Sequence, residues 1–340
     1  STLPQPIWSY AVDTSIHFKK IMLTYILFAL SFVLLIKGAD WLVTGATAIA
    51  RRFRVSDMII GLTIVSVGTS MPELIVSILA SFNGNSGLAV GNVFGSNVAN
   101  ILLILGVAAL IYPLPIKRNT VMSEIPFSLL AALLVGFLAN AALFDRYDGL
   151  IISRADGCIL LSFFALFMLY IFRVAKEEKQ QTEEIHSKPT ALWRSGGLVL
   201  LGIFSLFLGG KWTVDGATFI ATQLGMSESF IGLTVVAIGT SLPELVTSVV
   251  AAKQRNTDIA VGNAVGSNIF NLLWVLGISS VIHPLPFNVL SNFDILAIIS
   301  TSTLLILLVS LGKNQVVSRV GGGLFLLCYV AYVILLIQRG

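Results

Sequence analysis

Two glutamates, Glu73 and Glu244, lie in the middle of apolar segments that are long enough to span a lipid bilayer. Each is part of the same short motif, which reads GTSMPEL at 68–74 and GTSLPEL at 239–245. A charged side chain at that depth costs roughly 2.5–3.5 kcal/mol on insertion scales, so an intramembrane carboxylate indicates a functional site. Carboxylate and hydroxyl oxygens are hard ligands, suited to Na⁺ or Ca²⁺ and poorly suited to soft metals. The two motifs therefore predict a cation site.

A helix break is expected inside each motif. Pro72 has no N–H to donate to the carbonyl of Gly68, and its ring clashes with the preceding turn of a helix. Pro243 has the same relation to Gly239. Broken backbone within a membrane is tolerated only where it is buried in protein or lines a wet cavity. We therefore expect backbone carbonyls to be available to ions at both breaks.

Polar side chains recur at helical spacing around the glutamates. Hydroxyl groups share the helix face of each carboxylate, namely Thr69, Ser70 and Ser77 beside Glu73, and Thr240, Ser241 and Ser248 beside Glu244. Two further segments carry a polar residue at every fourth position, namely Asn92, Ser96 and Asn100, and Asn263, Ser267 and Asn271. We expect these stripes to meet near the middle of the bilayer as a cage of oxygen ligands. For Asn92, Asn97, Asn263 and Asn268, packing between helices explains the residue type equally well.

The composition excludes a soluble globular protein. Of 340 residues, 56% are hydrophobic and 11% are charged, whereas a soluble protein has about 25% charged residues. The expected surroundings are a lipid bilayer. The sequence has no basic patches with interleaved aromatic residues, which argues against nucleic acid as a partner.

About 20 apolar residues cross the hydrocarbon core, and on that measure the sequence contains ten spans. They are expected near 21–50, 55–82, 87–112, 121–143, 149–173, 195–221, 226–252, 257–282, 288–312 and 317–338. Residues 1–20 lack the continuous apolar segment of a signal peptide, and we expect them to form an interfacial or disordered arm. A polar linker at 174–194, expected to be cytoplasmic, separates two units at 21–173 and 195–340.

The two units are repeats of one another at a constant offset of 171 residues. GNVFGSNVAN at 91–100 matches GNAVGSNIFN at 262–271, and Trp41 matches Trp212. Because five spans is an odd number, the second unit must enter the membrane upside down relative to the first. The sequence therefore predicts an all-α integral membrane protein with ten transmembrane helices in two inverted five-helix repeats.

Positive charge supports the inversion. Most of the 21 lysines and arginines follow odd-numbered spans. Arg54 corresponds to Gly225 in the other repeat, whereas Gly84 corresponds to Arg255, so equivalent loops have exchanged their charge. By the positive-inside rule the basic loops are cytoplasmic. This predicts a multi-pass protein of the cell membrane (plasma or inner membrane) with both termini extracytoplasmic.

The motif GTS[LM]PE followed by GNxxGSNxxN, present twice, closely resembles the signature of the sodium/calcium exchanger family of cation/Ca²⁺ antiporters. The likeness covers nearly all of the chain after residue 20, and it is to prokaryotic-type members without large regulatory domains. The resemblance implies a transporter and no enzyme, with no cofactor and with Ca²⁺ and Na⁺ as transported ions. It also implies exchange of about three Na⁺ for one Ca²⁺ by alternating access, with spans one and six sliding over a stationary core. We expect the protein to act as a monomer.

The resemblance also implies roles for individual residues. It implies a Ca²⁺ site between Glu73 and Glu244, with the backbone carbonyls of Thr69 and Thr240. Flanking Na⁺ sites would draw on the hydroxyls of Ser70, Ser96, Ser241 and Ser267 and on the carbonyls of Ser66 and Ala237. Asn100 and Asn271 would line the centre. Members of the potassium-dependent branch have an acid at the position of Asn271, so this neutral residue indicates a K⁺-independent exchanger.

The charges of the site and the ions predict the electrical character of the exchange. Two carboxylates neutralise one Ca²⁺, whereas three Na⁺ leave a charge of +1, so exchange is expected to be electrogenic.

Three alternative functions stay open. The main alternative is a Ca²⁺/H⁺ antiporter or an exchanger of another divalent cation. An intramembrane hydrolase with a serine nucleophile would need a general base nearby, but His17, His186 and His283 lie outside the spans or at their ends. A passive channel has no sequence feature that separates it from a carrier.

Overall fold

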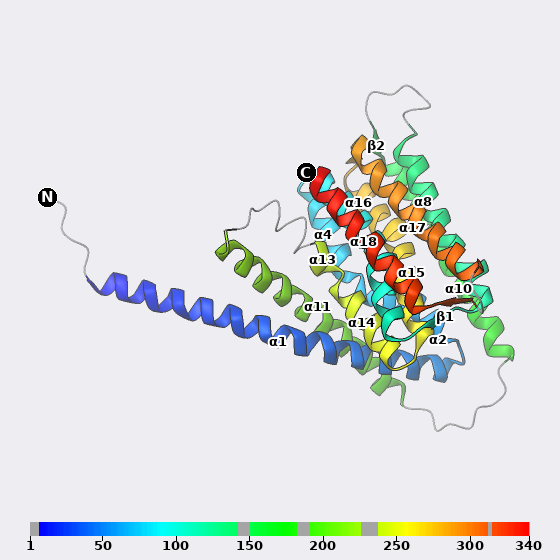
Figure 1. The fold of residues 1–340 in the computed structure, drawn as a ribbon, viewed down its shortest axis with the longest axis horizontal. Helices are drawn as coiled ribbons and strands as arrows, with labels where there is room; N and C mark the ends of the chain where they lie inside the picture. The colour runs from blue at the N-terminus through cyan, green and yellow to red at the C-terminus, as the bar shows by residue number, and fades with distance from the viewer. Residues whose placement is uncertain (1–6, 142–149, 182–190, 226–236, 312–314, 340) are drawn as a thin grey trace.

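The structure is a computed structural model that describes residues 7–141, 150–181, 191–225, 237–311 and 315–339, and it is almost entirely helical (Figure 1). The first repeat contains α1 (Ile7–Phe53), α2 (Asp57–Ile60), η1 (Gly61–Val65), α3 (Ser66–Thr69), α4 (Met71–Phe82), α5 (Ser86–Ala99), η2 (Asn100–Ile104), α6 (Leu105–Ile111), β1 (Leu114–Pro115), α7 (Arg118–Met122), α8 (Glu124–Ala139), β2 (Ile151–Ile152) and α10 (Arg154–Gln181). The second contains α11 (Leu192–Gln223), α13 (Ala237–Thr240), α14 (Leu242–Lys253), α15 (Thr257–Ile269), η4 (Phe270–Val275), α16 (Leu276–Ile282), β3 (Leu285–Pro286), η5 (Val289–Ser291), α17 (Asn292–Leu311), β4 (Val316–Val317) and α18 (Arg319–Arg339).

The described helices confirm an all-α membrane fold. Eight helical segments are long and apolar enough to cross a membrane, and the bent pair Asp57–Thr69 and Met71–Phe82 provides a ninth. The span expected at 226–252 lies partly outside the described residues, and its described part consists of α13 and α14. The total of ten spans therefore stays a prediction.

Two helices extend beyond the ends expected from hydropathy. Helix α1 begins at Ile7, so it runs through much of the segment that we expected to be a separate arm. Helix α10 ends at Gln181, eight residues inside the expected linker. The sequence after Arg173 is polar but rich in good helix formers, and Arg173 pairs with Glu177 one turn later at 3.1 Å. Hydropathy marks where a helix leaves the lipid, and it does not mark where the helix ends.

The inverted relation of the repeats is visible in α1 and α11, which are repeat equivalents and lie side by side (Figure 1). Their backbones meet at glycines. A Cβ on Gly202 would lie 2.8 Å from the carbonyl oxygen of Gly38, and a Cβ on Gly45 would lie 2.8 Å from that of Ser195. Residue numbers therefore rise along α1 as they fall along α11. Equivalent helices that run antiparallel confirm that the two repeats are inverted.

Two short antiparallel strand pairs connect the repeats in the same reciprocal way. Strand β1 pairs with β4 and β2 pairs with β3, so each pair joins one strand from each repeat. Leu114 lies opposite Val317, and its repeat equivalent Leu285 lies opposite Ile152. The same two-fold relation therefore holds at the periphery of the molecule and between its longest helices.

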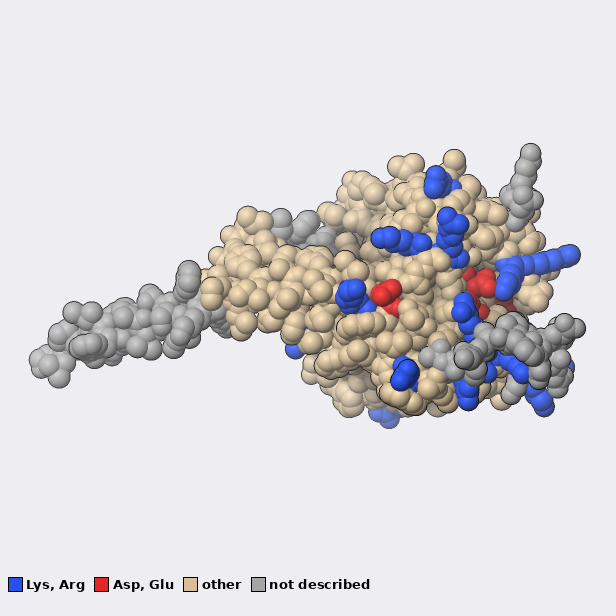
Figure 2. Space-filling model, turned by 90° about the horizontal axis from the view of Figure 1, so that it is seen from below, with Lys and Arg blue, Asp and Glu red and all other residues tan. Residues whose placement is uncertain are grey.

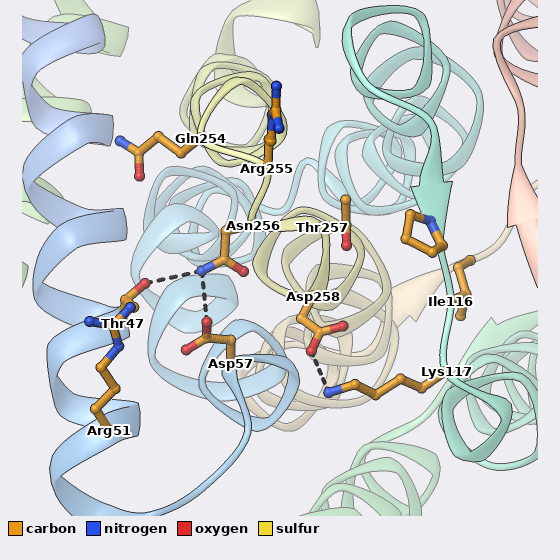
Figure 3. Close-up of a pocket in the computed structure, with 11 residues that line it drawn as sticks. Thr47, Arg51, Asp57, Ile116, Lys117, Gln254, Arg255, Asn256, Thr257 and Asp258 are labelled. Carbon is orange, nitrogen blue, oxygen red and sulfur yellow. Dashed lines mark hydrogen bonds and ion pairs between the residues drawn. The ribbon is translucent and has the colours of Figure 1, made fainter. Parts of the chain in front are cut away.

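Basic loops from both repeats gather at one end of the molecule. Figure 2 shows lysine and arginine side chains spread over the face seen from below, with a few acidic groups among them. Arg51, Lys117 and Arg255, which follow the first, third and seventh expected spans, line one pocket of about 550 Å³ there (Figure 3). Within the same pocket Lys117 pairs with Asp258 at 2.6 Å. These three loops, which we expected on one side of the membrane, therefore share one end.

The exchange of charge between repeats also shows in the backbone. Gly84 and Gly225 end helices in the left-handed region, with φ of 69° and 76°, and their equivalents Arg255 and Arg54 adopt φ of 60° and 56°. This conformation costs a residue with a Cβ roughly 1–2 kcal/mol. Arginine therefore takes the place of glycine at the basic end in both repeats despite the steric cost.

Candidate cation site

Both motifs form the helix break that the prolines predict. Helix α3 ends at Thr69 and α4 begins at Met71, with Ser70 between them at φ −81° and ψ 10°. The two parts of this span are bent by 47°. In the second repeat Ser241 occupies the same position between α13 and α14, at φ −87° and ψ 6°. Each break thus places a Thr-Ser pair at the junction of two short helices.

The two carboxylates are buried, and each is bonded across the repeat boundary. Glu73 is 0% exposed and Glu244 is 1% exposed. Ser70 Oγ donates to Glu244 Oε1 at 2.8 Å, and Ser241 Oγ donates to Glu73 Oε1 at 3.3 Å. The glutamate of each repeat is therefore held by the serine at the break of the other. This reciprocal exchange builds one shared site instead of two separate ones.

Two carboxamides complete the connection between the repeats. Asn263 Nδ2 donates to the Glu244 carbonyl at 3.1 Å, and Asn263 Oδ1 accepts from Thr69 Oγ1 at 3.0 Å. Asn92 makes the equivalent pair of contacts, donating to the Glu73 carbonyl at 3.2 Å and accepting from Thr240 Oγ1 at 3.3 Å. Both residues were left open by the sequence as packing or site residues. Their repetition at one offset in the GNxxGSNxxN motif is the signal that could have identified them as site residues.

The remaining polar residues of the predicted cage also lie together. Ser267 Oγ lies 3.0 Å from Ser70 Oγ, and Asn271 Nδ2 donates to Ser96 Oγ at 3.1 Å. Asn100 donates to the side chain of Asn268 in the other repeat at 2.9 Å. All of these side chains are buried.

Each repeat places the last asparagine of its GNxxGSNxxN motif in a π-helical turn. Asn100 begins η2, and Asn271 lies in η4. Such turns are rare and concentrate at functional sites, because the wider turn changes the direction of the side chains that it carries. Regular α-helical spacing does not predict this feature.

Several oxygen atoms in this cluster have no hydrogen-bond donor among the described residues. They are Glu73 Oε2, Glu244 Oε2, Asn100 Oδ1 and Asn271 Oδ1. An unpaired buried acceptor costs about 1–3 kcal/mol, and a charged one costs more. A cation is the group that satisfies several acceptors at once. The donor set consists of hard oxygens, which fits Na⁺ or Ca²⁺ as transported substrates.

Two predicted residues are placed less directly. Ser66 directs its hydroxyl to the Leu62 carbonyl at 2.8 Å, and its own carbonyl accepts from Ser70 N at 3.0 Å. Ala237 is the first residue of α13, next to the segment that is not described. Within the described part of the chain, no group of three His, Cys, Asp or Glu side chains could hold a metal. The cluster therefore depends on two carboxylates supported by neutral oxygens.

Most described side chains of the cluster are buried. The two carboxylates and the site hydroxyls range from 0% to 7% exposed, whereas Asn92 is partly exposed. The basic pocket of Figure 3 contains none of these residues.

Comparison with known proteins agrees with this geometry. A family model described as "Sodium/calcium exchanger protein" matches residues 23–173 and 194–338. The chain is 39% identical over 325 residues to the putative antiporter CaxA of Alkalimonas amylolytica, covering 93% of this chain and 99% of that protein. It is 32% identical over 349 residues to the sodium/calcium exchanger MaX1 of Methanosarcina acetivorans, with the same coverage.

Solved structures of the sodium-calcium exchanger NCX_Mj share the fold. One of them, from a crystal soaked in 10 mM Na⁺ without Ca²⁺, has a TM-score of 0.79 and 34% identity, covering 92% of this chain and 99% of that one. These relatives are transporters, which is consistent with a chain that is not an enzyme. The family model matches both repeats, and two relatives match almost end to end. The chain belongs to the sodium/calcium exchanger family.

Proposed function

We propose that this protein exchanges Na⁺ for Ca²⁺ across a membrane at the cluster around Glu73 and Glu244. One observation carries the proposal. Each carboxylate accepts a hydrogen bond from the other repeat and keeps a second oxygen without a donor among the described residues. Two such oxygens in a buried cluster fit a dehydrated cation.

In this proposal Ca²⁺ binds between the two glutamates, with the carbonyls of Thr69 and Thr240 as further ligands. Na⁺ occupies flanking positions that use the oxygens of the remaining residues, namely Ser66, Ser70, Ser96, Asn100, Ala237, Ser241, Ser267 and Asn271. No other cofactor is invoked. Because both ions share the carboxylates, the binding of one excludes the other, and this competition couples their movements.

Charge balance makes the proposed exchange electrogenic. One Ca²⁺ neutralises the two carboxylates, whereas three Na⁺ leave one positive charge. Moving one elementary charge across a membrane is worth about 2.3 kcal/mol per 100 mV. Because Asn271 is neutral, we propose that K⁺ is not transported.

Alternating access would follow from the position of α1 and α11. They are antiparallel and pack closely at glycines, so the two helices can move as one unit. We propose that the pair moves along the remaining helices and opens the cluster to one side at a time. With its basic end cytoplasmic, the monomeric protein lies in the cell membrane with both termini outside.

Ion flux in vesicles tests the proposed function. The full-length protein is reconstituted in Na⁺-loaded vesicles, and uptake of radioactive Ca²⁺ is measured with Na⁺ or choline outside and with K⁺ present or absent. We expect uptake only with an outward Na⁺ gradient, insensitive to K⁺ and accelerated by an inside-positive potential. Uptake driven by a pH gradient without Na⁺ would replace the proposal with Ca²⁺/H⁺ antiport.

A further inference from the structure

Asn92 and Asn263 make equivalent hydrogen bonds in the two repeats, each to a glutamate carbonyl and to a threonine of the other repeat. Each carboxamide lies between the glutamate helix of its own repeat and the broken helix of the other. Asn263 Nδ2 donates to the Glu244 carbonyl and to Ser248 Oγ at 2.9 Å, and its oxygen accepts from Thr69. Asn92 repeats this arrangement, with Ser77 Oγ at 2.9 Å. Asn263 is 0% exposed, so these contacts are made without competition from water.

The two residues at each break divide their contacts in a regular way. Thr69 binds the carboxamide of Asn263, and the next residue, Ser70, binds the carboxylate of Glu244. In the other repeat Thr240 binds Asn92 and Ser241 binds Glu73. Each Thr-Ser pair therefore makes one neutral and one charged connection to the opposite repeat.

These two kinds of connection respond differently to an ion. A cation at the carboxylates competes for the oxygens that accept from the serines, so the serine contacts change with ion occupancy. The threonine–asparagine contacts join neutral groups, and they need not be broken for an ion to bind. They are the fixed part of the connection between the repeats.

We propose that Asn92 and Asn263 are positioning residues that hold the two glutamates opposite each other, through the threonines at the helix breaks. This inference rests on the proposed function, because it assumes that the cluster binds the transported ions. The carboxamides coordinate no ion. They fix the separation of two carboxylates that would otherwise repel each other, so that a single cation can contact both.

Substitution by leucine tests this role. Asn263→Leu removes the contacts to Thr69, Ser248 and the Glu244 carbonyl and keeps the branching of the side chain, although its methyl groups are larger than the amide. The matched control is Asn140→Leu. Asn140 also joins the repeats, through reciprocal amide contacts to Asn292 at 2.7 and 2.8 Å, but it lies outside the cluster. Calorimetry on the purified full chain gives the Kd for Ca²⁺ and for Na⁺, and thermal unfolding reports the fold.

We expect Asn263→Leu to raise the Kd for both ions about 10-fold or more, because the misplaced carboxylates serve both ions. In vesicles its KM for Ca²⁺ should rise by a similar factor, with a smaller change in the maximal rate. Asn140→Leu should lower thermal stability and leave both Kd values within about 2-fold. Equal losses of affinity in the two variants would show a purely structural role and overturn the inference.

A second variant keeps the inference testable if Asn263→Leu does not fold. Thr69→Val breaks the same contact from the other side, and it should raise both Kd values about 3-fold or more. An unchanged Kd in either folded variant overturns the inference. Wild-type protein that binds Ca²⁺ without Na⁺ exchange would refute the proposed function alone, because the positioning role is measured by binding.

Discussion

Replacing one of the two carboxylates by its neutral isostere is the most direct test of the cation site. Glu244→Gln keeps the side-chain oxygen that accepts from Ser70 at 2.8 Å, so the connection between the repeats can persist. It removes one of two negative charges from a cluster in which both glutamates are at most 1% exposed. The perturbation is therefore mainly electrostatic.

The size of the effect follows from burial. With Ca²⁺ bound, the wild-type cluster is neutral, whereas the variant keeps one uncompensated positive charge away from water. Removing one partner of a buried ion pair costs about 3–5 kcal/mol. Each 1.4 kcal/mol is a factor of ten in Kd. We therefore expect the Kd for Ca²⁺ to rise about 10²- to 4 × 10³-fold, and Na⁺-driven Ca²⁺ uptake to disappear at micromolar Ca²⁺.

Glu124→Gln is the matched control, because it makes the same chemical change at a buried acid outside the site. Glu124 is 5% exposed and accepts from the Tyr170 hydroxyl at 2.8 Å, at the beginning of α8. Calorimetric Kd and vesicle uptake are measured for both variants, with thermal unfolding to confirm that they fold. The control should bind Ca²⁺ like the wild type. A folded Glu244→Gln protein with wild-type affinity and flux would refute the assignment of the site.

Three further changes test other parts of the structure. Pro72→Ala restores an N–H that can donate to the Gly68 carbonyl, so the 47° bend should straighten and the exchange rate should fall about 10-fold or more. A vesicle flux equal to that of the wild type would show that the break is dispensable. Asn271→Asp places a third carboxylate against Ser96, and the Kd for Ca²⁺ should fall about 10-fold by calorimetry, because the cluster gains negative charge. An unchanged Kd would place Asn271 away from the ions. Gly262→Ala puts a Cβ 2.9 Å from the Met58 carbonyl oxygen, which should cost about 1–3 kcal/mol in thermal or denaturant unfolding. At Gly91 a Cβ meets nothing within 4 Å, so equal losses in Gly91→Ala and Gly262→Ala would contradict a packing effect.

Local chemistry explains why the helix breaks could be predicted from the sequence. A proline lacks the N–H of a regular helix wherever it lies, and Pro72 and Pro243 therefore determine a break with no knowledge of their surroundings. The inverted repeats were also accessible, because a constant offset and an odd number of spans leave only one relation between the halves. The identities of Glu73 and Glu244 as site residues follow from the cost of burying charge.

Helical spacing predicts that the serines lie near the glutamates, but it does not predict which glutamate each serine binds. Spacing places Ser70 on the same helix face as Glu73, but in the folded chain its hydroxyl donates to Glu244, 174 positions away. The break at Ser70 interrupts the regular helix, and the two-fold packing brings the other repeat within reach. No local pattern contains that partner. The same limit applies to Asn92 and Asn263, whose residue type fits packing and positioning equally well.

The sequence by itself determined an all-helical membrane protein, its doubled motif and the two acids that define the chemistry. It did so because hydropathy, helix breaking and the cost of a buried charge are properties of short segments. Only the tertiary structure decided which hydroxyl and which carboxamide form hydrogen bonds with each glutamate. Those contacts join the two repeats. The antiparallel packing of equivalent helices brings together residues that lie far apart in the sequence.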